Sequence, residues 1–568
     1  MRKFFKTKNW ARIWKRFGAK EKIRLGIFFV LIIFAASWIV RDFYRSQTSE
    51  ISASGGGYVE AVSESPHSIN PLLATNDADR DLSRLIFSSL LKYDTGGGLA
   101  PDLAAGYAVS KDGKIYTIKL KDGVYWQDGE PFGADDVLFT INAVQNPATN
   151  SPLRNSWTGV KAESPEKNTI VLTLKSPYGG FAENLAMLGI IPRHIWSKVS
   201  PQNFPLADFN LKPVGTGPYK FVKLQKDSLG RIISANLAAN DKYFAPAPLI
   251  KNISFKFYQS EEEAISAFNR KEADGILLQT AQNENQIRGL ADSSVFRLAS
   301  PRVYALFINT NDPILKDKSV RLALNYAIDK NSLFKKLISG EGKIAVGPIP
   351  PGESGSAPDL SGYDFDSQKA GSMLEHAGWT KNESGVYAKK LDKKDKESSP
   401  LKFSLITIQS MQIAAEMISN DLKNAGIEAD VKVVSLGDLQ QNYIKTKNYG
   451  TVLIGESYTA FADPYAFWSG AAIKDAGLNL SFYTNNKADG ILAAARKISD
   501  PVKRAKQLEE FQKLVLADAP AAFLYSPDYI YIVKNNIRNI NLKGMLIVSS
   551  NRFAGIVNWY AQTERIWK

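Results

Sequence analysis

The sequence predicts an α/β fold, and three observations indicate it. The first is composition: 568 residues, 44% hydrophobic and 23% charged, lie close to the globular average, which excludes wholesale disorder and leaves chain for several cores. The second is a set of hairpin signals between residues 107 and 129. The third is an alternation of strand and helix patterns between residues 401 and 456, which predicts a parallel sheet.

A membrane signal precedes these patterns. Residues 1–24 hold ten Lys or Arg and the single acid Glu21, and residues 25–40 (LGIFFVLIIFAASWIV) carry no charge. Because basic flanks stay in the cytoplasm, we expect a basic cytoplasmic segment, then a transmembrane anchor or signal, and an exported body from about Arg41 onward. The small residues 35–37 are followed by Trp38 and not by a polar start, which favours a retained anchor over a cleaved signal.

A buried core helix is the alternative interpretation of residues 25–40, but it leaves the preceding ten bases unexplained. Residues 41–57 are expected to form a flexible tether, because the segment ISASGGG (51–57) can bury little surface. The basic segment supplies nine of the fourteen net positive charges, and the remaining +5 is too balanced for a phosphate-tracking surface. We therefore expect no nucleic-acid partner.

The first half of the body has clear local signals. Asp-Gly occurs at 112, 122 and 128 within an alternating segment, which predicts tight hairpins. A helix is predicted over 134–144, with acids in its first turn, and a strand over 169–174. Ser260 is a plausible N-cap for a helix over 260–271.

The second half continues the alternation. The apolar spacing of residues 320–328 predicts a helix, which Asp329 ends before capping the next one. LKFSLITI, IEADVKVVS and TVLIGE are predicted strands, separated by two helices. The charged run 389–400 is expected to be a solvated loop.

Catalytic and metal-binding motifs are absent from the sequence. The three histidines, at 67, 194 and 376, lie far apart and form no metal-ligand spacing, and cysteine is lacking altogether. No P-loop or GxSxG pattern occurs, and the glycines of GTGP (215–218) predict a tight turn before a strand. We expect no metal, no cofactor and no catalytic residue, and the alternative that the 57 acids leave open is a pair of carboxylates suited to glycoside hydrolysis.

Several long blocks carry a resemblance to a known family. SINPLLATNDADRDLSRLIFSSLLKYD, PDLAAGYAVSKDGKIYTIKLKDGVYWQDGEPFGADDV, VGTGPYKF, INTNDPILKDKSVRLALNYAIDK and GYDFDSQKAGSMLEHAGW follow one another in that family's order. The sequence, over about 58–560, resembles the bacterial extracellular solute-binding proteins of family 5, which include peptide and nickel receptors of ABC importers.

The resemblance implies a two-lobed periplasmic-binding-protein-like fold of type II with an extra subdomain, here added to one N-terminal transmembrane helix. Ligand would be trapped between the lobes without bond chemistry, so an enzyme is not expected. The implied division is lobe I from residues 58–90, 210–305 and 521–560, the subdomain from 91–209, and lobe II from 306–520.

Candidate ligand residues follow from the same resemblance. The stretch GESYTAFADPYAFW (455–468) contains the matching Asp463-Pro464, and its Tyr458 and Phe461 are aromatic candidates. Peptide binders carry an acid three residues before that pair, to hold the ammonium group, and here the position is Ala460. Glu456 or Asp463 could substitute, or either could be a capping or turn residue.

Two more candidates precede the crossing into lobe II. Arg302 can take a carboxylate in bidentate fashion, and Tyr304 lies two residues further along the same segment. A surface arginine is the alternative. Trp126, in contrast, is expected to pack in the core.

We therefore expect a monomeric, single-pass protein of the cytoplasmic membrane, with its C-terminal domain in the periplasm or at the cell surface. Its expected function is to receive a solute, most readily an oligopeptide, and to pass it to an ABC permease. An anchored sensor or adhesion module with the same fold is the alternative, favoured by Ala460. An exported hydrolase is the third possibility.

Overall fold

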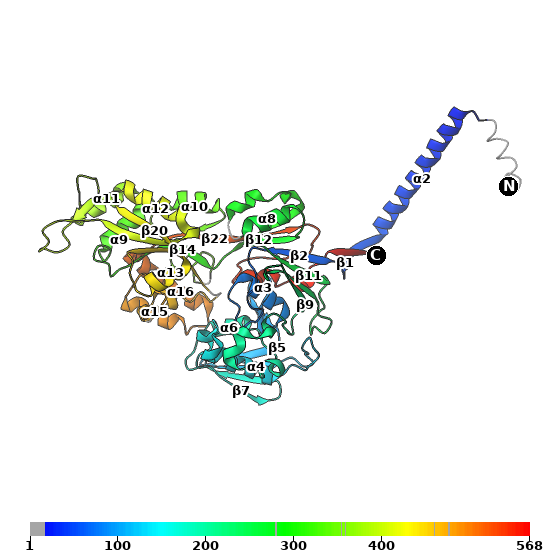
Figure 1. Ribbon diagram of the computed structural model, residues 1–568, viewed down its shortest axis with the longest axis horizontal. Coiled ribbons are helices and arrows are strands. Elements are labelled where there is room, and N and C mark those ends of the chain that lie inside the picture. The colour runs from blue at the N-terminus through cyan, green and yellow to red at the C-terminus, as the bar shows by residue number, and fades with distance from the viewer. Residues whose placement is uncertain (1–16, 279–280, 354, 358, 459–460, 475–476) are drawn as a thin grey trace.

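A long exposed helix leads into the folded body. The computed structural model describes residues 17–568 apart from 279–280, 354, 358, 459–460 and 475–476. Helix α2 (Ala19–Gln47) has no buried residue, and its apolar window has a mean hydropathy of 2.4. Among the described residues it is the one helix long and apolar enough to cross a membrane, and it projects away from the rest of the chain (Figure 1). It contains the whole predicted segment 25–40 and extends it at both ends.

The predicted tether is ordered, which corrects our expectation for residues 41–57. Helix α2 continues to Gln47, and strand β1 (Thr48–Ala53) follows directly and pairs antiparallel with β23 (Gln562–Trp567). The partner strand lies about five hundred residues away in sequence, so no local pattern could indicate the pairing. A short turn at 54–56 remains, where the N–H of Gly55 donates to the carbonyl of Leu249 at 2.8 Å.

Lobe I is built on a mixed sheet. Its strand order is β9-β10-β11-β2-β12-β22, with β13 also paired to β22. Strand β2 runs parallel to both of its neighbours, β11 and β12. The helices are α3 (Asp77–Ile86) and α8 (Glu261–Asn269), and Ser260 caps α8 as predicted. The strands are β2 (Gly57–Val62), β9 (Tyr219–Lys226), β10 (Ile232–Ala239), β11 (Asn252–Phe257), β12 (Gly275–Leu278), β13 (Ser293–Ala299) and β22 (Ala521–Lys534).

Lobe II contains the predicted strand and helix alternation. Strands β19 (Lys402–Ile408), β20 (Glu428–Val434) and β21 (Thr451–Ser457) are parallel to one another, which confirms the βαβαβ prediction. The order β20-β19-β21-β14-β22 includes β14 (Arg302–Ile308), and β15 (Gly342–Ile344) adds to β22. Small strands at Thr380–Lys381, Tyr387–Lys389 and Ser399–Pro400 form β16–β18. The helices are α9 (Lys318–Ala327), α10 (Lys330–Ile338), α11 (Ser367–His376), α12 (Gln412–Asn424), α13 (Leu436–Asp438), α14 (Tyr465–Trp468), α15 (Asn486–Ala495) and α16 (Pro501–Asp518).

Two segments cross between the lobes. Residues 300–301 join β13 of lobe I to β14 of lobe II. Strand β22 belongs to both sheets, because its first part pairs with β14 and β15 and its second part with β12 and β13. The two bodies therefore share a short strip of backbone, which is where a hinge would bend (Figure 1).

The third body is the subdomain, a four-stranded antiparallel sheet covered by helices. Its order is β5-β6-β8-β7, and it contains the predicted hairpin and the predicted helix α4. Trp126 is fully buried, as expected, and its Nε1 donates to Asp136 at 3.3 Å. The strands are β3 (Leu91–Tyr93), β4 (Leu99–Pro101), β5 (Ala104–Val109), β6 (Ile115–Leu120), β7 (Lys161–Glu166) and β8 (Thr169–Thr173), and the helices are α4 (Ala134–Gln145), α5 (Arg154–Trp157), α6 (Phe181–Met187) and α7 (Arg193–Trp196).

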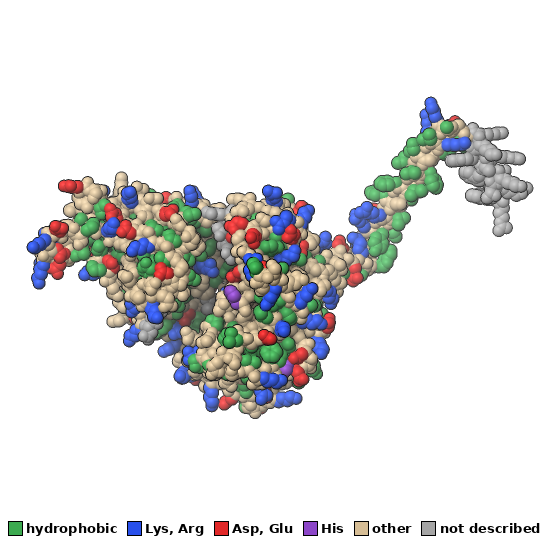
Figure 2. All heavy atoms as spheres, in the orientation of Figure 1, with side chains coloured by type: hydrophobic (Ala, Val, Ile, Leu, Met, Phe, Trp, Pro, Cys, Tyr) green, Lys and Arg blue, Asp and Glu red, His purple; other side chains and the backbone are tan. Residues whose placement is uncertain are grey.

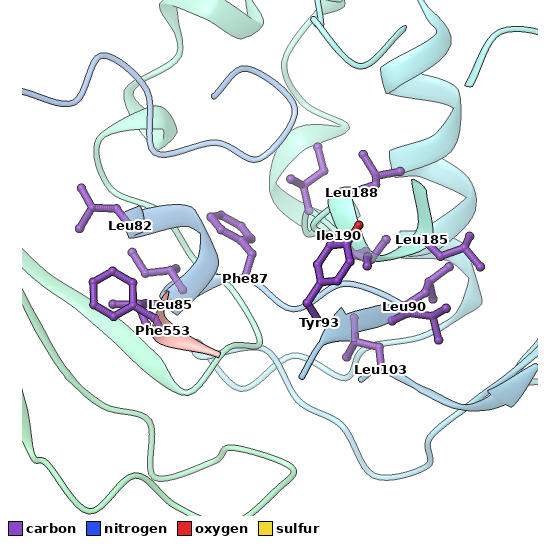
Figure 3. Close-up of a cluster of buried hydrophobic side chains, with 14 of the residues drawn as sticks. Leu82, Leu85, Phe87, Leu90, Tyr93, Leu103, Leu185, Leu188, Ile190 and Phe553 are labelled. Carbon is purple, nitrogen blue, oxygen red and sulfur yellow. The ribbon is translucent and has the colours of Figure 1, made fainter. Parts of the chain in front are cut away.

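Buried apolar side chains pack the subdomain against lobe I. Leu82, Leu85 and Phe87 at the end of α3 lie in one buried cluster with Leu185 and Leu188 of the subdomain (Figure 3). The predicted GTGP turn also packs on this helix: a Cβ added at Gly215 would lie 1.9 Å from the carbonyl oxygen of Ile86, so only glycine fits there.

A buried ion cluster joins three segments of lobe I. The Arg552 guanidinium donates to Glu60 of β2 at 2.9 Å and to Asp81 of α3 at 2.5 Å, and all three side chains are at most 2% exposed. The hydroxyls of Tyr58 and Tyr531 also donate to Glu60. Every charge in the cluster has a partner, as buried ions require.

Candidate functional site

A cavity of about 440 Å³ lies between the subdomain and lobe II. Its walls mix aromatic rings, hydroxyls and a few charges, a lining suited to a polar organic ligand. In Figure 2 the surface is hollowed between the lobe II body and the other two. The lining residues are Asn155, Ser156, Thr158, Gly159, Val160, Leu174, Lys175, Ser176, Tyr178 and Phe181 from the subdomain, and Ser457, Tyr458, Asp463, Ala466, Phe467 and Arg496 from lobe II.

Tyr458 lies in the cavity wall, directly after Ser457, the last residue of strand β21. Its backbone N–H donates to the carbonyl of Pro301 at 2.7 Å, which ties the wall to the crossing segment. Its hydroxyl accepts from Nε1 of Trp468 at 3.2 Å and donates to Glu456 at 3.3 Å. The ring is therefore held in place by hydrogen bonds and is only 5% exposed.

Asp463 lies in the same wall and is already paired. Its carboxylate accepts from Nε of Arg496 at 2.8 Å and from the backbone N–H of Tyr465 at 3.1 Å, at the start of α14. The Arg496 guanidinium also lies over the rings of Tyr178 and Tyr465, with 5.2 and 4.6 Å to the centroids. Asp463 is thus a turn residue, one of the alternatives left open by the sequence, and it also faces the cavity, while its role as an ammonium ligand stays a prediction.

Glu456 does not line the cavity. Its side chain sits behind Tyr458 and is 5% exposed, and its Oε1 has no hydrogen-bond partner among the described residues. Burial raises the pKa of Glu456 well above its ordinary value, although hydrogen bonds from Tyr458 and Trp468 oppose the rise. In this conformation the carboxyl group is enclosed, and burial favours its neutral form.

Phe461 makes one of the contacts between lobe II and the subdomain. Its ring meets Tyr178 edge-on at 5.4 Å, and the Arg504 guanidinium lies 3.6 Å from its centroid. A Cβ added at Gly180 would come within 2.6 Å of Cγ of Phe461, so the ring rests on a bare glycine. Ala460, the position of the missing acid, lies outside the described residues.

Arg302 and Tyr304 lie together where β14 leaves the crossing. Arg302 donates from Nε to Ser457 Oγ at 3.1 Å and from its terminal nitrogen to the Tyr304 hydroxyl at 3.3 Å. The Tyr304 ring stacks on Tyr525 of β22, with centroids 5.0 Å apart. No ion pair joins Arg302 to an acid of the described chain, so its guanidinium keeps donors for an anionic group. Ser457 links this pair to the cavity wall.

Sequence reasoning missed several wall residues. Arg496 ends helix α15 in a basic segment that reads as ordinary surface, and Tyr178 and Phe181 belong to the subdomain. No local pattern connects them to residue 463. Among the described residues, no group of three or more His, Cys, Asp or Glu is placed to hold a metal ion.

The chain is similar in sequence to proteins of a known family. Residues 98–477 match the family model described as bacterial extracellular solute-binding proteins, family 5, middle region. The chain belongs to this family. The family 5 assignment makes it a solute-binding protein with two lobes, as its sequence resemblance implied.

Individual relatives agree with the family 5 assignment. The oligopeptide-binding protein AppA of Bacillus subtilis is 29% identical over 85% of this chain and 88% of its own length. The dipeptide-binding protein of Escherichia coli is 25% identical over 81% and 87%, respectively. Among solved structures, NikZ of Campylobacter jejuni in complex with Ni(L-His) has a TM-score of 0.73 at 26% identity, covering 89% of this chain and 99% of NikZ.

Proposed function

We propose that this protein is a membrane-anchored extracytoplasmic receptor that captures an oligopeptide and delivers it to an ABC permease. The family and the relatives that bind oligopeptides and dipeptides support the cargo class. Helix α2 and the bases ahead of it support the anchor. We propose the same division of the chain that the sequence predicts: residues 58–90, 210–305 and 521–560 for lobe I, 91–209 for the subdomain and 306–520 for lobe II.

The observation that carries this proposal is the guanidinium of Arg302, which forms no ion pair among the described residues and is linked to the cavity wall through Ser457. A peptide of any sequence ends in a carboxylate, and a guanidinium can hold it through two hydrogen bonds. Ser457 joins Arg302 to the cavity, where Tyr458 and Phe467 offer aromatic faces to peptide side chains. Tyr304 orients Arg302 by accepting its hydrogen bond.

The other candidate ligand residues have roles that differ from that of Arg302. Asp463 forms the wall and, through Arg496, keeps it in place. Glu456 positions the hydroxyl of Tyr458 and is not an ammonium ligand in this conformation. Phe461 is a closure contact, because it touches the subdomain across the cavity edge.

The mechanism needs no bond chemistry. A ligand that contacts the subdomain and lobe II together favours the closed arrangement over the open one, and it shifts the equilibrium by the difference in affinity. The closed surface is then what a permease would recognise. We propose that the receptor acts as a monomer and has no enzymatic activity.

Thermal unfolding of the full chain in lipid nanodiscs tests the cargo. Pools of two- to eight-residue peptides should raise the midpoint, since a ligand at a hundred times its Kd adds about 2.7 kcal/mol. Arg302→Gln should abolish the shift, and Arg270→Gln, an arginine paired to Glu272 on the surface, should retain it. Peptides that leave the midpoint of ligand-free protein unchanged would contradict a peptide cargo.

The anchor has its own test. Membrane-bound protein should keep residues 1–40, so its N-terminal peptide should be found by mass spectrometry in the membrane fraction. A mature chain starting after residue 37 would contradict the retained anchor.

The alternative is an anchored sensor or adhesion module with the same fold. Ala460 in place of the acid that peptide binders carry is the feature that favours it. A permease that co-purifies with the membrane-bound protein would decide for import. A receptor that is found only with signalling or surface partners would decide for the alternative.

A further inference from the structure

Strand β23 is fastened to the end of the apolar helix, and not only to β1. The backbone N–H of Lys568 donates to the carbonyl of Gln47 at 2.9 Å, and its Nζ donates to the carbonyl of Ser46 at 2.9 Å. In Figure 1 this two-stranded ribbon stands between α2 and the lobes. The chain therefore passes from the helix to the ribbon without a loose joint.

Arg565 strengthens the same junction. Its guanidinium donates to the Thr48 hydroxyl at 2.9 Å and to the carbonyl of Arg45 at 3.1 Å. Thr48 in turn donates to the carbonyl of Tyr44 at 2.6 Å and is 2% exposed. The last carbonyls of α2, which a helix leaves without partners, are thus satisfied by the ribbon.

Aromatic and apolar side chains gather on this junction and remain exposed. Tyr44 of α2 and Trp567 of β23 meet edge to face, with centroids 5.8 Å apart. Trp567 is 64% exposed, Phe43 is 61% exposed and Ile566 is 45% exposed. Such a group is costly in water but typical of the boundary between lipid and water, where Trp and Tyr are enriched.

The depth of these residues fits that boundary. Tyr44 lies four residues beyond Val40, the end of the uncharged segment, which is about 6 Å along a helix. The interfacial layer of a bilayer is about 5–7 Å thick on each side. Residues 25–40 rise about 24 Å, so a hydrocarbon core of about 30 Å centred on them extends about 3 Å past Val40, and Tyr44 with its neighbour Trp567 falls just outside it, in the headgroup layer. Arg41, Arg45 and Lys568 place positive charges at the same level, next to lipid phosphates.

We propose that the β1–β23 ribbon is a juxtamembrane clamp: Trp567 and Ile566 insert into the lipid headgroup layer beside α2, and the ribbon holds the lobes in a fixed orientation to the bilayer. This inference rests on the membrane anchoring proposed above. It assigns the exposed apolar group to lipid because the group is continuous with the helix that spans the membrane.

The absence of cysteine makes a direct test straightforward. The full chain carrying Trp567→Cys, labelled with an environment-sensitive fluorophore, is placed in nanodiscs whose lipids bear bromine close to the headgroup. The label at 567 should be quenched several-fold more strongly than one at Val502→Cys, which is 67% exposed on α16 in lobe II. Equal, weak quenching at both positions would overturn the clamp.

A third label distinguishes failure of the clamp proposal from failure of the membrane anchoring. Phe43→Cys lies on α2 itself and should be quenched whenever the helix is inserted, whatever the ribbon does. An unquenched label at 43 would show that the anchoring has failed, and with it the basis of the clamp. A quenched label at 43 with an unquenched label at 567 would contradict the clamp alone, and shielding at 567 only after a permease is added would assign the surface to protein.

Discussion

The carboxylate of Asp463 accepts a 2.8 Å hydrogen bond from Nε of Arg496, in the wall that faces the subdomain. The Asp463 side chain is 13% exposed and that of Arg496 is 40% exposed. Solvent therefore weakens this ion pair mainly from the Arg496 side. The same carboxylate also accepts from the N–H of Tyr465. One side chain therefore sets both the turn and the ionic edge of the cavity.

Replacing Asp463 should separate these two roles. Asp463→Asn keeps an acceptor for the Tyr465 N–H and should cost less than about 1 kcal/mol, since it loses only a partly exposed ion pair. Asp463→Ala also loses the turn acceptor and should cost about 1–2 kcal/mol. Denaturant unfolding of both variants gives the comparison. Equal losses would contradict a role for the turn hydrogen bond.

Glu456 should make stability depend on pH. Its folded pKa is raised above the unfolded value of about 4.5 by burial, so the stability of the folded form is greatest below that value. As pH rises toward the folded pKa, the unfolded chain ionises while the folded chain does not, and stability falls.

The variant Glu456→Gln removes this titration and keeps the shape. Its unfolding midpoint, relative to the unchanged chain, should increase as the pH rises above the unfolded value of about 4.5 toward the raised folded pKa of Glu456. Other buried acids cancel in that difference, because both proteins contain them. A difference that is constant with pH would mean that the pKa of Glu456 is not raised in the folded state.

The contact of Phe461 with Gly180 should control closure. A methyl group at Gly180 would come within 2.6 Å of the ring, and such overpacking costs about 1–3 kcal/mol. Gly180→Ala should therefore weaken ligand binding about tenfold or more and favour the open arrangement in small-angle scattering. The double variant Gly180→Ala/Phe461→Ala restores space and should recover part of the closed population. An unchanged affinity in Gly180→Ala would show that this contact is absent from the bound state.

The pairing of β1 with β23 predicts a specific cross-link. Ser52 and Thr563 are opposite each other, so Ser52→Cys/Thr563→Cys should form a disulfide in the membrane-bound protein. The pair Ser52→Cys/Ile566→Cys is three residues out of register, about 10 Å away along the strand, and should stay reduced. Cross-linking of both pairs would show that β1 and β23 do not keep one register, and would favour the flexible tether that the sequence predicts.

Local patterns indicated most elements but not their long-range partners. The parallel strands β19, β20 and β21 follow one another in sequence with helices between them, so their alternation was visible. Strand β1 has no such signal, since β23 alone makes it a strand. Glycines at 55–57 predict flexibility, but the N–H of Gly55 donates to the carbonyl of Leu249 and Gly57 lies opposite Asn252 of β11, both about two hundred residues away in sequence.

In the candidate site, too, local sequence patterns do not identify contacts between residues far apart in the chain. The stretch 455–468 was found from its resemblance, and Tyr458 and Asp463 do face a cavity. Glu456 lies near the end of an apolar strand and is an equally good candidate by sequence, but Tyr458 and Trp468 enclose it, which depends on the fold around the strand. Arg496, which pairs with Asp463, is thirty-three residues further along the chain and lies in a different helix.

The buried cluster around Arg552 should be the most sensitive charged site of the body. Its guanidinium neutralises Glu60 and Asp81, and all three are almost fully enclosed. Arg552→Met would leave two carboxylates buried close together, which should destabilise the fold by about 3–5 kcal/mol. Arg270→Met, at an exposed pair with Glu272, should cost less than about 1 kcal/mol. Denaturant midpoints of the two variants provide the measurement, and similar small losses would mean that water reaches the cluster and screens its charges.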